Sequence, residues 1–144
     1  MIKTIAKVLQ TKGNAVWTVS PDATIYEALE IMSGHGAGAL LVMEGENIVG
    51  IFSERDYARS VELKGLETRQ TKVSLVMTEV VHHISPEKSV EEAMAVVTDA
   101  RCRHLPVLDG DKLVGMVSIG DLVKASLAEK DFLIDQLKSY IKGQ

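Results

Sequence analysis

The segment Leu113–Leu122, LVGMVSIGDL, repeats the pattern of Ile48–Tyr57, IVGIFSERDY, at a distance of 65 residues. Both segments contain a glycine, two apolar residues and a serine, and an aspartate follows three residues after the serine. The same register holds without a gap for about a dozen identities in about forty positions, among them Pro21 with Pro86. A fixed period of this kind indicates a tandem duplication.

The composition fits a compact globular protein. The chain has 144 residues, of which 46% are hydrophobic and 25% are charged. A copy of about 65 residues would be marginally stable alone, so we expect the two copies to share a core. The net charge of −4 argues against a general nucleic-acid-binding protein, which usually carries a basic field.

The chain shows no sign of secretion or membrane insertion. Its N-terminal residues lack the apolar core and cleavage site of a signal peptide, and no apolar run approaches the roughly 18 residues that span a bilayer. Cys102 is the only cysteine, which excludes an internal disulfide. We therefore expect a cytoplasmic protein that binds neither membrane nor nucleic acid.

Each copy has the same predicted order of elements. A short β-branched run ends at Ser-Pro, and a helix follows with the S/T-x-x-E spacing of a capping box, at Thr24 in the first copy and Ser89 in the second. A hairpin with a glycine in its turn comes next, and a second helix begins at Ser53 or Ser118. The sequence predicts an α+β fold of two β-α-β-β-α repeats.

Composition places the domain boundaries. We expect a first repeat with an N-terminal helix at residues 1–64, a polar linker and lead-in at 65–79, a second repeat at 80–128 and an amphipathic helix at 129–144. The last helix carries an apolar stripe, which consists of Leu133, Leu137, Tyr140 and Ile141. Such a stripe needs a partner surface, either on its own domain or on a second copy of the chain.

The repeated serine and aspartate have two interpretations. The serine ends a strand and opens a helix, and the amides of a helix start can bind an anion. The aspartate, in the first helical turn, presents two acceptor oxygens that suit the vicinal hydroxyls of a ribose. The alternative is that S-x-x-D is a capping box that needs no ligand.

The whole pattern resembles the CBS domain, named for cystathionine β-synthase, over about residues 3 to 128. The resemblance rests on the duplication, on the β-α-β-β-α order and on the stretch RHLPVLDGDKLVGMVSIGDL. It implies a module with a pseudo-two-fold axis whose clefts bind adenosine ligands such as AMP, ADP, ATP, S-adenosylmethionine or NAD(H). It also implies that Asp56 and Asp121 hold the ribose and that Ser53 and Ser118 lie near phosphate.

The resemblance extends to further candidate nucleotide-binding residues. Adenine is expected against the first strand and the start of the second in each copy. In the first copy these residues are Thr18, Val19, Gly38, Ala39 and Leu40. In the second copy they are His83, Ile84, Arg103, His104, Leu105 and Pro106.

Local cations can meet a phosphate despite the acidic total. We expect Arg101 and Arg103 to share one face of a strand, since alternate residues do so. Further candidate contacts with the nucleotide are Lys12, Arg55, Ile119 and Gly120. In the 65-residue register Lys12-Gly13 stands opposite Met77-Thr78, and Glu54-Arg55 opposite Ile119-Gly120, so the two clefts should not bind identically.

Catalysis and metal binding have little support in the sequence. No nucleophile and base accompany either S-x-x-D motif, and Cys102 with His104 falls short of the three or four ligands of a zinc site. We therefore predict a regulatory module without catalytic activity or required cofactor, which binds AMP, ATP or NAD(H), forms a homodimer and acts on a partner protein in trans. The alternatives are a homodimeric scaffold with vestigial sites, and a protein that binds S-adenosylmethionine or metal.

Overall fold

The computed structural model describes residues 3–79 and 81–142 and divides the chain into two compact units. The first-repeat unit is formed by residues 16–81. The second-repeat unit is formed by residues 82–142 together with the N-terminal residues up to 15.

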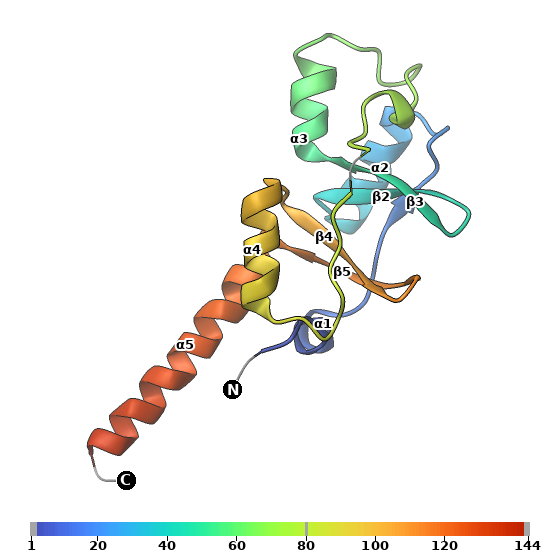
Figure 1. The fold of residues 1–144 in the computed structure, drawn as a ribbon. Helices are drawn as coiled ribbons and strands as arrows, with labels where there is room; N and C mark the ends of the chain where they lie inside the picture. The colour runs from blue at the N-terminus through green and yellow to red at the C-terminus, as the bar shows by residue number, and fades with distance from the viewer. Residues whose placement is uncertain (1–2, 80, 143–144) are drawn as a thin grey trace. The chain divides into compact units, whose positions relative to one another are not determined.

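The first-repeat unit contains a three-stranded sheet in the order β1-β2-β3. Its elements are β1 (Thr18–Val19), α2 (Ile25–His35), β2 (Ala39–Glu44), β3 (Asn47–Ser53), α3 (Glu54–Asp56), a π-helix η1 (Tyr57–Glu62) and a 3-10 helix η2 (Val73–Leu75). Strand β1 is parallel to β2, and β2 is antiparallel to β3. Figure 1 shows η1 continuing from α3.

The second-repeat unit has the same arrangement with a shorter sheet. Its elements are α1 (Ile5–Lys12), α4 (Val90–Ala100), β4 (His104–Asp109), β5 (Lys112–Ser118) and α5 (Ile119–Ile141). Strands β4 and β5 are antiparallel. The strand predicted before α4 is reduced to one parallel bridge between Ile84 and Val107. The α+β class and the duplicated order of elements are confirmed.

Each unit is completed by a segment that lies outside its own repeat in the sequence. The amide of Val90 donates to the carbonyl of Lys3, and the amide of Ile25 donates to the carbonyl of Thr71, both at 2.9 Å. The N-terminal helix thus packs with the second repeat, and the segment 71–78 packs with the first. We call residues 3–12 and 71–78 the exchanged segments. The two units of the structure therefore group the chain differently from the boundaries at residues 64 and 79 that we expected from the sequence.

The two exchanged segments align with each other at a spacing of 68 residues, whereas the repeats themselves align at 65. A β-carbon on Gly115 would lie 2.8 Å from Cδ2 of Leu9, and one on Gly50 would lie 2.6 Å from Sδ of Met77. Leu9 and Met77 are therefore structural equivalents. Glycine is favoured at these positions in the middle of β3 and β5 because another segment approaches the backbone closely.

Helix ends also differ between the copies. Helix α2 ends at Gly36 with φ of 62°, and α4 ends at the equivalent residue Arg101 with φ of 55°. Because Arg101 has a left-handed conformation and precedes the strand, the predicted alternation of Arg101 and Arg103 along one strand face is wrong.

The hydrophobic residues form two separate cores. One contains Ile5, Leu9, Val90 and Leu122 in the second-repeat unit. The other contains Ile25, Phe52 and Val73 in the first-repeat unit. The exchanged segments supply apolar side chains to the core of the unit in which each lies, and the expectation of a core shared between the copies stays a prediction.

Candidate functional site

Both S-x-x-D motifs form capping boxes at strand-to-helix junctions. Oδ2 of Asp56 accepts hydrogen bonds from the amide (2.9 Å) and the hydroxyl (3.1 Å) of Ser53. Oδ2 of Asp121 accepts from the amide of Ser118 at 2.8 Å, and the amide of Asp121 donates to Oγ of Ser118 at 3.1 Å. The capping interpretation is confirmed at both positions, and the ribose contact stays a prediction.

The first helical amides are largely used within each unit. The amide of Glu54 donates to the carbonyl of Gly38 at 3.1 Å, and the equivalent amide of Ile119 donates to the carbonyl of Arg103 at 2.8 Å. The third amide in each helix binds the capping serine. A phosphate at these helix starts would therefore depend mainly on side-chain cations, not on helix amides.

A third residue reaches each aspartate from the exchanged segment. The hydroxyl of Thr78 donates to Oδ1 of Asp56 at 2.9 Å. Nζ of Lys12 donates to Oδ2 of Asp121 at 2.5 Å and to the carbonyl of Met116 at 2.7 Å. Lys12 and Thr78 each donate a hydrogen bond to the aspartate of their unit, although neither the 65-residue register of the repeats nor the 68-residue register of the exchanged segments aligns them.

Thr78 is a partner of Asp56 that the sequence did not predict. Its place beside Asp56 follows from its bridge to Ile51 in β3. The 68-residue register of the exchanged segments places Thr78 opposite Gln10, so no repeat in the sequence points to it.

The pKa of Asp121 is lowered from its ordinary value by its surroundings. Burial would raise this pKa, but the hydrogen bonds from Lys12 and Ser118, together with the positive charge of Lys12, lower it by more. The carboxylate therefore stays ionised at neutral pH and available as an acceptor. Its side chain is 26% exposed, so a ligand can reach it.

Two of the predicted site residues lie directly opposite the capping serines. His104 lies opposite Ser118 across the β4-β5 ladder, and Ala39 lies opposite Ser53 across β2-β3. Lys12, Thr18, His83, Arg103, Ile119 and Gly120 are exposed, and Arg55 is half-buried.

Other predicted contacts have little accessible surface. The side chains of Val19, Leu40, Ile84 and Leu105 belong to the hydrophobic cores, and Pro106 is also buried. Any contact of these residues with adenine would have to use their backbone, and this role stays a prediction.

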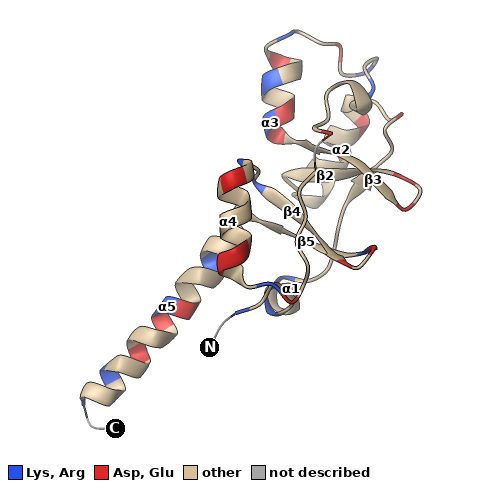
Figure 2. Ribbon diagram, viewed as in Figure 1, with Lys and Arg blue, Asp and Glu red and all other residues tan. Residues whose placement is uncertain are grey.

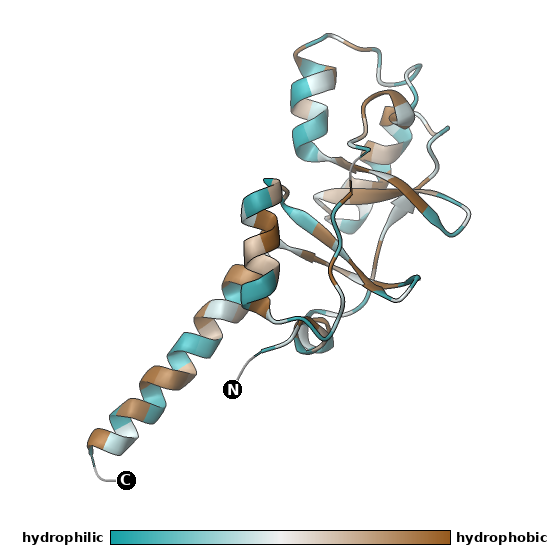
Figure 3. Cartoon of the chain, viewed as in Figure 1, coloured by the Kyte–Doolittle hydropathy of each residue, from teal (hydrophilic) through white to brown (hydrophobic). Residues whose placement is uncertain are grey.

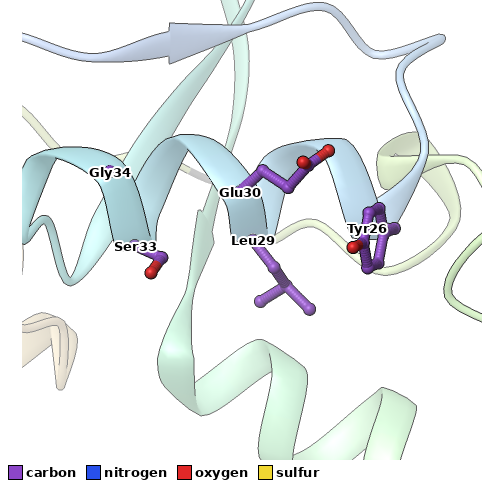
Figure 4. A pocket seen from close by; sticks show the side chains of 5 residues that line it. All are labelled: Tyr26, Leu29, Glu30, Ser33 and Gly34. Carbon is purple, nitrogen blue, oxygen red and sulfur yellow. The ribbon is translucent and has the colours of Figure 1, made fainter.

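A cavity of about 420 Å³ lies along α2, away from the predicted site residues. Tyr26, Leu29, Glu30, Ser33 and Gly34 line it, and Figure 4 shows these residues along one side of the helix. The guanidinium of Arg69 lies 4.0 Å from the ring centre of Tyr26.

Metal-binding clusters and membrane-spanning helices are absent from the described residues. No three histidine, cysteine, aspartate or glutamate side chains lie close enough together to hold a metal ion within 3–79 and 81–142. No helix in that part of the chain is long and apolar enough to cross a membrane. Cys102 packs partly against the second-repeat core, and burial raises the pKa of its thiol.

Comparison with known proteins agrees with this architecture. The model of the CBS domain matches residues 8–62 and again residues 73–128. The chain belongs to the CBS domain family. CBS domain pairs are generally regulatory modules that bind adenosine ligands, and proteins that consist of such pairs are generally not enzymes.

Similar proteins with CBS domains come from plants and bacteria. The chain is 38% identical to the mitochondrial CBS domain-containing protein CBSX3 of Arabidopsis thaliana, over 97% of this chain and 72% of that protein. A solved structure with CBS domains from Burkholderia ambifaria is 45% identical, with a TM-score of 0.83, over 88% of this chain and 95% of that one. The CBS-domain protein of Agrobacterium tumefaciens is 36% identical, with a TM-score of 0.81, over 86% and 99% of the respective chains.

Proposed function

We propose that this CBS domain pair is a cytoplasmic sensor that binds an adenosine ligand of the AMP, ATP or NAD(H) type and regulates a partner protein in trans. The observation that carries the proposal is the ionised, accessible carboxylate of Asp121 at the start of α5, with the ammonium group of Lys12 beside it. A ribose diol needs a hydrogen-bond acceptor and a phosphate is favoured by a cation, and these two side chains supply both.

The chemistry of the two side chains supports this ligand class. Each carboxylate oxygen accepts hydrogen bonds from hydroxyl groups, and an ammonium group has three N–H donors. Two of the Lys12 donors are used, by Asp121 and by the carbonyl of Met116. The third is available for a phosphate oxygen.

Thermal unfolding with a panel of ligands tests the proposal. AMP, ATP, NADH, S-adenosylmethionine and zinc would each be added to the full chain, because a ligand that binds only the folded state raises the unfolding midpoint by mass action. We expect an adenine nucleotide to give the largest rise, with guanosine nucleotides as the matched control. A rise with zinc alone would support the metal alternative, and no rise with any ligand would support a scaffold with vestigial sites.

We also propose that the chain forms a homodimer through the C-terminal half of α5. Residues 130–142 are exposed, including Leu137 (62%), Tyr140 (83%) and Ile141 (80%). Figure 1 shows this half of α5 extending beyond the other elements of its unit, and Figure 3 shows hydrophobic turns along it. The expected alternative, that this stripe packs on its own domain, has no support in the arrangement of the second-repeat unit.

Charge favours a second copy in antiparallel orientation as the partner of this helix. Apart from Lys130, the charges at its start are acidic, at Glu129, Asp131 and Asp135, and those at its end are basic, at Lys138 and Lys142 (Figure 2). Antiparallel pairing brings the acidic start of one helix beside the basic end of the other. The exposed segment is about 18 Å long at about 1.5 Å per residue, which is enough for several layers of side chains.

A further inference from the structure

The equivalent positions around Asp56 and Asp121 differ in charge, which gives a comparison within one molecule. Each aspartate has a partner from the exchanged segment, which is neutral Thr78 in one unit and cationic Lys12 in the other. The residue whose carbonyl binds the first helical amide is Gly38 in one unit and Arg103 in the other. Gly38 and Arg103 occupy equivalent backbone positions, whereas Thr78 and Lys12 correspond only in their contact with the aspartate.

The net charge near the two carboxylates has opposite sign in the two units. In the first-repeat unit Glu54 and Asp56 outweigh Arg55, so the helix start is net negative. In the second-repeat unit Ile119 and Gly120 replace Glu54 and Arg55, and Lys12 with Arg103 outweighs Asp121. Since few helix amides remain to bind an anion, side-chain charge decides which junction attracts phosphate.

The two carboxylates also differ in which of their oxygens already accept hydrogen bonds. Both oxygens of Asp56 accept hydrogen bonds from neutral donors, Oδ1 from Thr78 and Oδ2 from Ser53. At Asp121 both the amide of Ser118 and Nζ of Lys12 donate to Oδ2, and within the described part of the chain no hydrogen bond reaches Oδ1. A hydroxyl donor can therefore bind Asp121 without displacing a partner.

We propose that the two sites differ in the ligand charge they accept: the second-repeat site binds the phosphate-bearing adenine nucleotide through Asp121, Lys12 and Arg103, and the first-repeat site does not bind it. This assignment rests on the proposed function and adds the location and the charge selectivity. The chain then binds one nucleotide, and its first-repeat site can take only an uncharged adenosine.

Replacing each cation by the neutral residue that has the corresponding contact in the first-repeat unit tests the assignment. Lys12→Thr and Arg103→Gly would be compared with Lys112→Thr, a change of an exposed lysine at the far end of the same hairpin. Calorimetry with ATP and with adenosine would measure affinity and stoichiometry. We expect one ATP per chain, about tenfold weaker ATP binding in each site variant, and unchanged ATP binding in Lys112→Thr.

The ratio of ATP affinity to adenosine affinity separates a charge role from a structural role. Loss of a phosphate contact lowers this ratio, whereas a general distortion of the fold weakens both ligands together. Two ATP molecules per chain with similar affinity, or an unchanged ratio in both site variants, would overturn the assignment and leave the proposed function in place. Absence of binding by the wild type of any adenosine ligand would overturn both.

Discussion

Nζ of Lys12 lies 2.5 Å from Oδ2 of Asp121, although the two residues are 109 positions apart in the sequence. The contact joins the end of α1 to the start of α5 and therefore holds the exchanged N-terminal segment to the second repeat. Because the contact lowers the pKa of Asp121, it also links stability to pH.

Stability should fall on the acid side of the Asp121 titration. A carboxyl group whose pKa is lowered on folding contributes stability above its unfolded pKa, near 3.8, and this contribution is lost as the pH falls through the lower folded pKa. In Lys12→Met, we expect the free energy of unfolding to decrease less with falling pH than in the wild type. Urea denaturation between neutral pH and the acid range, with Lys112→Met as the control, measures it. An identical acid dependence in both variants would contradict the role of Lys12.

Asp121→Asn separates ribose recognition from helix capping. Asparagine keeps the shape and much of the capping capacity, but one acceptor oxygen is replaced by a donor that opposes a hydroxyl group. Affinity for the nucleotide should fall by about 1.5–3 kcal/mol, whereas the free energy of unfolding without ligand should change by about 1 kcal/mol or less. Calorimetry and urea denaturation measure the two quantities.

The double variant with Asp56→Asn should bind no adenosine ligand. If it kept wild-type affinity and lost only stability, both aspartates would be caps and the ribose assignment would be wrong.

Gly50 in β3 and Gly115 in β5 should tolerate substitution by alanine to different degrees. A β-carbon on Gly115 meets the flexible end of the Leu9 side chain, whereas one on Gly50 also lies 3.0 Å from the backbone oxygen of Thr78. We expect Gly50→Ala to lower the free energy of unfolding by about 1–3 kcal/mol and Gly115→Ala to lower it less. Adding Leu9→Val to Gly115→Ala should restore part of the loss, and a larger effect at Gly115 than at Gly50 would contradict this order.

Arg101→Gly should stabilise the protein. Arg101 ends α4 in the left-handed conformation that its equivalent Gly36 adopts without strain. Relief of about 1–2 kcal/mol of strain, less about 0.4–1 kcal/mol for the greater freedom of glycine in the unfolded chain, predicts a net gain of about 0–1.6 kcal/mol. Thermal and urea unfolding check it, and Gly36→Arg provides the reverse test, in which stability should fall.

Removal of residues 130–144 should weaken self-association. The deletion removes the exposed apolar residues of the C-terminal half of α5 and leaves the buried Leu122 and Ala125 in place. Analytical ultracentrifugation should show a larger dissociation constant for the deletion and for Leu137→Glu, while Gln136→Glu serves as a control of similar charge. An unchanged dimer would show that association uses another surface.

Much of the local structure could be predicted from the sequence because its causes lie within a few residues. The capping boxes at Thr24, Ser53 and Ser118 depend on a spacing of three residues, and the duplication is visible as a repeated pattern. The strand expected around His83 and Ile84 was overestimated, because pairing with β4 is limited to one bridge.

The sequence by itself determined the two α+β repeats and the positions of their paired aspartates, since capping and apolar periodicity act over short distances along the chain. Only the tertiary structure decided which segment completes each repeat. Helix α1 buries Ile5, Val8 and Leu9 against the second repeat instead of the first, and this burial brings Lys12 to Asp121 and leaves Asp56 to Thr78. The charge of each site is thus set by long-range hydrophobic packing, which no spacing within a single repeat encodes.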